Sequence, residues 1–282
     1  MSADTRQSNA IFNQASIPQQ ASPRRPQSDE TPYESVPLPS KGLIYPAGSP
    51  LHGVTEVHIK PMTAREEDIL MSPALIKNGT AITSLIRSCL IDKSIDPTMM
   101  IAGDRNALVF SIRITGYGAQ YECSVECGEC DAKTDRVFDL LQCGINFLDI
   151  KPVSEFENRF EFVLPRTKKI VHFKFLTGQS EENATKQQLA RKKALGGAQI
   201  ENTVTENLRE AILSVDGVED RQKIADFVRN MPASDSLALR SYIATHSPDL
   251  ITKQVSECRA CGAAEEVSIP LGVSFLWPKI KR

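Results

Sequence analysis

Hydrophobic positions along the chain follow two periods, and each period predicts a different kind of element. Between residues 79 and 92, apolar side chains recur at helical spacing, at Ile82, Leu85, Ile86 and Cys89. An earlier helix that ends near Met71 is predicted by the capping box Thr63-Ala64-Arg65-Glu66, with Thr63 as N-cap and Glu66 as third helical residue. A short strand is predicted before it, over residues 54–59.

Residues 104–116 are ambiguous by period alone. Their apolar residues alternate as they would in a strand, at Leu108, Phe110, Ile112 and Ile114. We predict a helix here, because Asp104 is a favourable N-cap and Gly116 a favourable stop. The chain up to this point is therefore mainly helical.

Strand-like patterns follow between residues 120 and 175, with candidate strands at 121–125, 136–138, 156–164 and 170–175. Residues 181–194 have few apolar groups, so they predict a helix that is solvated or covered by a partner. Helices are also predicted at 201–215, 221–231 and 234–245, the last opened by Ser234-Asp235, and strands return at 250–255 and 267–269. The predicted fold class is α+β, with a helical N-terminal part, a strand-rich central part and a second helical segment.

Composition separates residues 1–35 from the rest of the chain. This segment is rich in Ser, Gln, Pro and Asn and has few large apolar groups, so it cannot offset its own ordering entropy. We predict a disordered arm that is either dispensable or ordered against neighbouring subunits. The predicted organisation is an arm at 1–35, a docking segment and helical subdomain at 36–118, and a strand-rich subdomain at 119–282 with inserted helices at 179–246.

Two apolar segments are candidates for contact with a partner. Prolines favour an extended path for residues 36–46, and the C-terminal segment contains the only Trp of the chain. The candidate partner-binding residues are Leu38, Pro39, Tyr45, Phe275 and Trp277. The alternative is that both segments pack on the protein's own core, which is the usual place for such side chains.

Four of the seven cysteines form two C-x-x-C motifs, Cys127 with Cys130 and Cys258 with Cys261. Strand-like residues flank each motif, so each is predicted to form a hairpin tip that offers two thiolates. Zinc prefers four tetrahedral ligands in a closed structural site, and we therefore predict one structural zinc ion per chain. An unmetallated or disulfide-bonded state is the alternative. Of the other cysteines, Cys89 is predicted to be a buried hydrophobe and Cys123 a spare ligand.

Charge and hydropathy narrow the class of protein. With a formal net charge of −2, the chain has no excess of positive charge to attract nucleic acid or an anionic membrane. There is no run of about 18 apolar residues to span a bilayer, and we expect no secretory leader. Paired C-x-x-C motifs fit metal binding in a reducing compartment, so synthesis in a cytoplasm is expected.

Motifs for catalysis are missing from the sequence. It contains no phosphate-binding glycine loop, no nucleophile elbow and no H-E-x-x-H zinc motif. The four histidines are scattered singly, and a zinc ion with four protein ligands has no open position for water. We therefore expect a protein without enzymatic activity.

Several short motifs occur in order between residues 36 and 130. They are Leu38-Pro39-Ser40-Lys41-Gly42-Leu43-Ile44-Tyr45-Pro46, Pro61-Met62-Thr63-Ala64-Arg65-Glu66-Glu67-Asp68-Ile69-Leu70, Gly103-Asp104-Arg105-Asn106, Tyr117-Gly118 and Cys127-x-x-Cys130. This order resembles the baseplate hub subunits of contractile-tailed, T-even-like phages. The resemblance implies a virion protein of the tail baseplate, assembled in the host cytoplasm, without enzymatic activity. Its implied partners are other baseplate hub, wedge or tail-tube proteins.

Two classes of function therefore stay open. The first is a structural and interaction protein, and the second is a zinc-ribbon adaptor that binds nucleic acid. Acidic residues surround the two C-x-x-C motifs, namely Glu126, Glu129, Asp131, Glu257, Glu265 and Glu266. Because they would repel phosphate, we expect no nucleic-acid partner.

Overall fold

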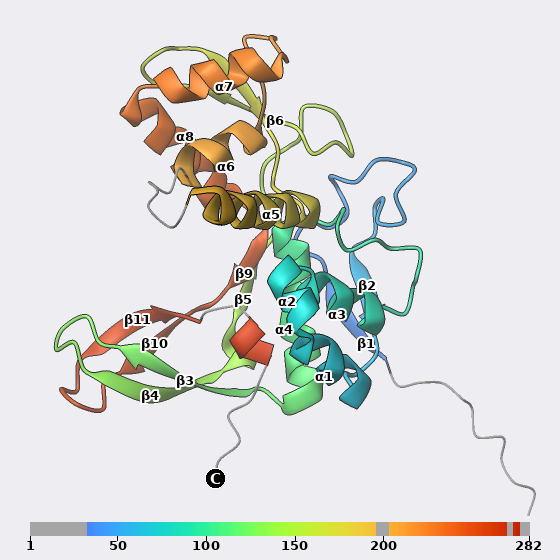
Figure 1. Cartoon of the computed structure of the whole chain (residues 1–282), viewed down its shortest axis with the longest axis vertical. Coiled ribbons are helices and arrows are strands. Elements are labelled where there is room, and N and C mark those ends of the chain that lie inside the picture. Colours follow the sequence, from blue (N-terminus) through green and yellow to red (C-terminus); the bar gives the residue numbers. More distant parts are fainter. Residues whose placement is uncertain (1–32, 196–202, 270–272, 277–282) are drawn as a thin grey trace, which may run out of the picture. The chain divides into compact units, whose positions relative to one another are not determined.

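The computed structural model describes residues 33–195, 203–269 and 273–276, and Figure 1 labels their elements. These residues all lie within one unit, Pro32–Arg282. The predicted arm lies outside the described residues as far as residue 32. Among the helices that the structure describes, none is both long and apolar enough to cross a membrane.

The N-terminal part consists of β1 (Glu34–Pro37), β2 (Glu56–Ile59), α1 (Ala64–Met71), α2 (Pro73–Asn78), α3 (Ala81–Cys89) and α4 (Ala102–Tyr117). The strands are antiparallel, with Val36 opposite Val57, and both side chains are buried. In the helical layer α1 packs on α3, α3 on α4 and α4 on β1. The helical spacing predicted for α3 is confirmed, because Leu85, Ile86 and Cys89 are all fully buried.

The helix predicted from residue 104 is confirmed as α4, but the role predicted for Asp104 is wrong. Ile101 is the N-cap, and Asp104 is the third helical residue. Its fully buried carboxylate accepts hydrogen bonds from the Ser40 N–H (2.9 Å), the Ser40 hydroxyl (2.6 Å) and the Tyr45 hydroxyl (2.6 Å). The carboxylate therefore joins α4 to a segment far away in the sequence.

That segment, residues 36–46, folds as a tight turn against the core. Lys41 and Gly42 both have left-handed backbone conformations, with φ of 53° and 70°. A Cβ atom on Gly42 would lie 2.4 Å from the backbone nitrogen of Val54, so only glycine fits there. The Ser40 and Tyr45 side chains are thereby positioned to reach Asp104.

Two hairpins carry the cysteine motifs: β3 (Gln120–Glu126) pairs with β4 (Lys133–Asp139), and β10 (Lys253–Glu257) pairs with β11 (Ala264–Ser268). The chain leaves the first hairpin through the short η1 (Leu140–Gln142) and β5 (Gly144–Asn146), and returns to the second through β9 (Asp249–Ile251). Strands β5 and β9 are antiparallel partners, with Ile145 opposite Leu250. This pairing explains how two distant motifs come together.

The region between β5 and β9 contains a three-stranded sheet and several helices. The strands, in sheet order, are β6 (Phe160–Val163), β7 (Ile170–Phe173) and β8 (Ile212–Val215). The helices are α5 (Gly178–Leu195), α6 (Thr203–Ala211), α7 (Arg221–Asn230) and α8 (Ala233–His246). The helix predicted over 201–215 is wrong in its last turn, which is β8. Ile212, Ser214 and Val215 are buried there, and Val215 pairs with Val171 of β7. Tertiary pairing overrides the helical pattern at this point.

The start of α8 also differs from the prediction. Pro232 is its N-cap, whereas Asp235 lies inside the first turn. The fully buried Asp235 carboxylate accepts hydrogen bonds from the backbone N–H groups of Arg166 (2.7 Å) and Thr167 (3.0 Å). Asp235 therefore holds the turn between β6 and β7 against the helix.

Candidate metal centre

The four cysteines of the two motifs converge at the hairpin tips, as the sequence predicts. Their sulfur atoms all lie within 4.8 Å of one another. The sulfurs of Cys127 and Cys261 are 3.8 Å apart, and those of Cys130 and Cys258 are also 3.8 Å apart. Cys127 and Cys258 are buried, whereas the second cysteine of each motif is exposed.

The two tips have equivalent backbone geometry. In the first, the Cys127 N–H donates to the Ala132 carbonyl (3.1 Å), and the Asp131 N–H donates back to the Cys127 carbonyl (2.9 Å). In the second, Cys258 pairs in the same way with Ala263 and Gly262, at 2.8 Å each. Asp131 and Gly262 also share a left-handed conformation, with φ of 55° and 76°. Each tip is therefore a closed turn that directs its two sulfurs to one point.

The cluster has the donor set and the dimensions of a zinc site. Four sulfurs at about 2.3 Å from a central zinc ion lie about 3.8 Å from one another. The Cys127–Cys261 and Cys130–Cys258 pairs have this spacing, and it is far longer than a disulfide bond of about 2.05 Å. All seven cysteines are free thiols, so the arrangement fits metal binding and not a disulfide framework.

Hydrogen bonds shift the pKa values of two thiols of the cluster, Cys258 and Cys130, in opposite directions. The backbone N–H groups of Cys261 and Ala260 lower the pKa of the Cys258 thiol to about 6. At Cys130 a backbone hydrogen bond with Ala132 lowers the pKa, but the hydrogen bonds with neighbouring thiols outweigh it and raise the pKa to about 12. Four adjacent thiolates repel one another, and a bound dication removes that cost.

An ion pair between a buried arginine and a half-buried glutamate joins the two hairpins near the cysteine cluster, and sequence reasoning did not identify it as part of the site. The Arg136 guanidinium on β4 donates to Glu265 of β11 (2.5 Å) and to the Ser256 carbonyl of β10 (3.2 Å). Glu265 also accepts from the Gly128 N–H of the first tip (3.0 Å). The hydrogen bond from the Gly128 N–H lowers the pKa of the Glu265 carboxyl most, and the one from Arg136 lowers it further, so this pKa lies below its usual range.

This pair links the two hairpins through a deeply buried guanidinium. Arg136 is among the largest fully buried side chains of the protein, and its positive charge lies close to the thiol cluster. Four thiolates and one zinc ion carry a net charge of about −2, which a nearby guanidinium partly offsets. The signal in the sequence is the alternation of β4, which places Arg136 on the same inward face as Phe138.

The remaining cysteines lie outside the cluster. Cys89 is buried in the main core, as predicted. Cys123 is buried on β3 and does not belong to the group of four converging sulfurs that the described residues form. Cys143 accepts a hydrogen bond from the Gln254 amide (3.2 Å).

The candidate partner-binding residues are not part of this centre. Leu38, Pro39, Tyr45 and Phe275 are buried in the protein's own core, where Phe275 stacks on Phe110 of α4. Trp277 lies outside the described residues. The burial is the arrangement that the core interpretation expects, and the partner-facing role of these side chains stays a prediction.

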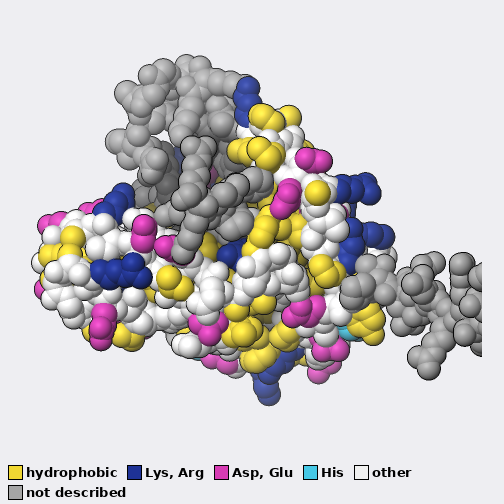
Figure 2. Space-filling model, turned by 90° about the horizontal axis from the view of Figure 1, so that it is seen from below, with side chains coloured by type: hydrophobic (Ala, Val, Ile, Leu, Met, Phe, Trp, Pro, Cys, Tyr) yellow, Lys and Arg dark blue, Asp and Glu magenta, His cyan; other side chains and the backbone are white. Residues whose placement is uncertain are grey.

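Charges of both signs are interspersed on the outer faces of the hairpins. Glu126, Asp131 and Glu266 are exposed there, and so are Lys133 and Lys253. Figure 2 shows acidic, basic and apolar side chains mixed over this region, with no continuous basic patch in that view. On the face that Figure 2 shows, the described residues of the hairpins form no positive stripe of the kind with which proteins usually follow a phosphate backbone.

Comparison with known proteins places the chain in one family. No curated protein and no solved structure matches it. A family model described as T4 bacteriophage base plate protein matches residues 34–277, which include both cysteine motifs and the whole region between them. The chain therefore belongs to the T4 bacteriophage base plate protein family.

Proposed function

We propose that the protein is a structural subunit of the baseplate hub in a contractile phage tail, with one structural zinc ion per chain. The observation that carries this proposal is the closed set of four protein thiols within the family-matched region. Because four protein ligands fill the coordination shell of zinc, the ion would stabilise structure and would leave no position for a substrate or a catalytic water. The protein acts in tail assembly through contacts with other hub, wedge or tail-tube proteins.

The zinc ion and the Arg136 pair have complementary roles in this proposal. Arg136 and Glu265 align the two hairpins, and the ion holds their tips together. A rigid two-hairpin projection presents a fixed surface to neighbouring subunits, which lowers the ordering cost of assembly. Cys127, Cys130, Cys258 and Cys261 would hold the ion, and Arg136, Glu265 and the backbone amides would orient its ligands.

Metal analysis and particle composition test the proposal together. The purified chain should contain about one zinc ion. Cys127→Ser should lose the ion, whereas the matched control Cys143→Ser, outside the cluster, should keep it. Mass spectrometry of purified phage particles should find the wild-type chain and the control, and the Cys127→Ser chain at reduced level.

Other results would contradict particular parts of the proposal. Iron in place of zinc would reject the assigned metal, because a four-sulfur site also accepts iron. Absence of the wild-type chain from particles would reject the baseplate role. Salt-dependent binding of duplex DNA with micromolar affinity would favour the alternative, a zinc-ribbon nucleic-acid adaptor.

A further inference from the structure

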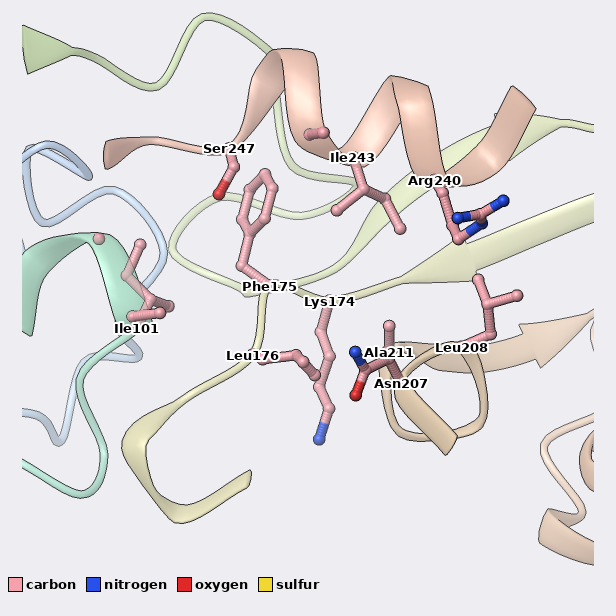
Figure 3. Close-up of a pocket in the computed structure, with 13 residues that line it drawn as sticks. Ile101, Lys174, Phe175, Leu176, Asn207, Leu208, Ala211, Arg240, Ile243 and Ser247 are labelled. Carbon is pink, nitrogen blue, oxygen red and sulfur yellow. The ribbon is translucent and has the colours of Figure 1, made fainter. Parts of the chain in front are cut away.

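A cavity of about 310 Å³ lies where the start of α4 meets α6, α8 and the segment after β7 (Figure 3). Its floor includes the buried side chains of Ile101, Phe175, Leu208 and Ala211. Three exposed residues form its rim, Asn207 of α6 and Arg240 and Ala244 of α8. Because the floor is buried and the rim is exposed, the cavity opens to solvent between these two helices.

Backbone hydrogen bonds fix the floor. The Ala102 N–H at the start of α4 donates to the Leu176 carbonyl (3.0 Å), and the Lys174 N–H donates to the Ala211 carbonyl (2.9 Å). Between them, the Phe175 N–H donates to the side-chain oxygen of Asn158 (2.9 Å). A ligand would therefore meet a preformed apolar surface, which lowers the entropy lost on binding.

The two cations that line the cavity differ in their partners. The Lys174 ammonium donates to Glu210 (2.9 Å), which also accepts from Ser180. The Arg240 guanidinium has no hydrogen-bond or ion-pair partner among the residues that the structure describes. Arg240 is thus the charge that remains available at the rim, and a carboxylate is the group that a guanidinium binds with two parallel hydrogen bonds.

We propose that this cavity binds a peptide segment of a neighbouring protein, with a large apolar side chain on the floor and a carboxylate against Arg240. The volume lies at the lower end of the range of roughly 300 to 1,000 Å³ for ligand sites, which suits one anchor residue better than a long acyl chain. The choice of a peptide rests on the proposed function, because a baseplate subunit assembles with other proteins. A single buried apolar anchor is a common source of binding energy at protein interfaces.

Two short peptides and three variants of the full chain test this site. The probes are acetyl-Ser-Gly-Leu-Phe with a free carboxylate and the same peptide with a C-terminal amide. Titrations followed by methyl NMR of Ile101 and Ile243 should show the free acid binding at least about fivefold tighter than the amide. Arg240→Gln should remove this difference, and Ala244→Trp, which fills the opening, should abolish binding. Arg229→Gln on α7 does not line the cavity and should change nothing.

Several outcomes would overturn the inference. Equal binding of acid and amide would show that the peptide carboxylate does not contact Arg240. Unchanged binding by Ala244→Trp with an unaltered melting temperature would show that the peptide does not enter the cavity. Tight binding of decanoate without binding of either peptide would identify a lipid-like ligand. If Ala244→Trp does not fold, Arg240→Gln decides, because an exposed side chain can be changed without loss of the fold. These measurements use the isolated chain, so their failure is distinct from failure to enter particles.

Discussion

The Tyr45 hydroxyl is a precise place to test whether residues 36–46 serve the protein's own core. It donates to Asp104 (2.6 Å) and accepts from the Ile101 N–H (3.1 Å) at the start of α4. Tyr45→Phe keeps the buried ring and removes only this oxygen. The variant loses a hydrogen bond to a buried carboxylate, worth roughly 1.5–3 kcal/mol, and leaves a buried N–H unpaired at a further cost of roughly 1–3 kcal/mol.

Because the two losses share one group and one site, they do not add fully, and we expect the free energy of unfolding to fall by about 3 kcal/mol. For a chain of this size, about 3 kcal/mol lowers the melting temperature by roughly 6–12 °C. Urea unfolding and calorimetry of the isolated chain measure both quantities. The control is Tyr33→Phe at an exposed position, which should change stability by less than about 0.5 kcal/mol.

The refuting result is a stability loss in Tyr45→Phe no larger than that of the control. If such a variant also entered particles poorly, the Tyr45 hydroxyl would contribute to partner binding and not to the stability of the free chain. A double-mutant cycle with Asp104→Asn adds a check on the assigned contact. Direct contact predicts a coupling free energy of roughly 0.5–3 kcal/mol between the two changes, whereas independent roles predict none.

Three further predictions address the metal centre, the capping box and the arm. Arg136→Met should lower zinc affinity roughly 10- to 100-fold in a chelator competition, and the exposed Arg259→Met should not, because only Arg136 joins the hairpins. Burial alone would raise the pKa of Glu66, but hydrogen bonds from Ser88, Thr63 and Lys60 outweigh it and hold the pKa well below its usual range. The ionised Glu66 side chain therefore stabilises the fold above the unfolded pKa of about 4.3, and this contribution is lost as pH falls. In Glu66→Gln the free energy of unfolding should depend less steeply on pH below about pH 4. Deleting residues 1–32 should leave zinc content and melting temperature unchanged and should reduce incorporation into particles, and normal incorporation would show that the arm is dispensable.

Local patterns in the sequence predicted most elements because local interactions determine them. The capping box at Thr63 and Glu66 is present at the start of α1. The family resemblance seen over residues 36–130 is confirmed by the match over residues 34–277. Convergence of the two C-x-x-C motifs was also predictable, because a closed zinc site needs four ligands and each hairpin tip offers two.

Other features depend on contacts that no local pattern contains. Asp104 has the residue type and position of an N-cap, yet its carboxylate binds Ser40 and Tyr45 across the core. The stretch before Val215 continues a helical pattern, yet pairing with β7 makes it a strand. Arg136 is a charged residue in a strand, and its buried charge is compensated only because the second hairpin supplies a carboxylate as its partner. In each case the partner is far away in the sequence: the hydrogen bonds of Asp104 and Arg136 span 64, 59 and 129 residues, and Val215 pairs with Val171.

Because β5 pairs with β9, the proposed zinc ion is not needed to bring the two distant parts of the chain together. These strands already close the loop formed by the inserted region, and β9 is anchored to α4 by two hydrogen bonds from the Asn106 amide to the Asp249 carboxylate. The backbone there is so close that a Cβ atom on Gly103 would lie 1.8 Å from the Pro248 carbonyl oxygen. Loop-closure entropy grows with the length of chain that is still free, so the proposed ion would close only the short connections between these strands and the hairpin tips. A bound ion would therefore stabilise chiefly the two hairpins, because the return of the chain is already held by β5, β9 and α4.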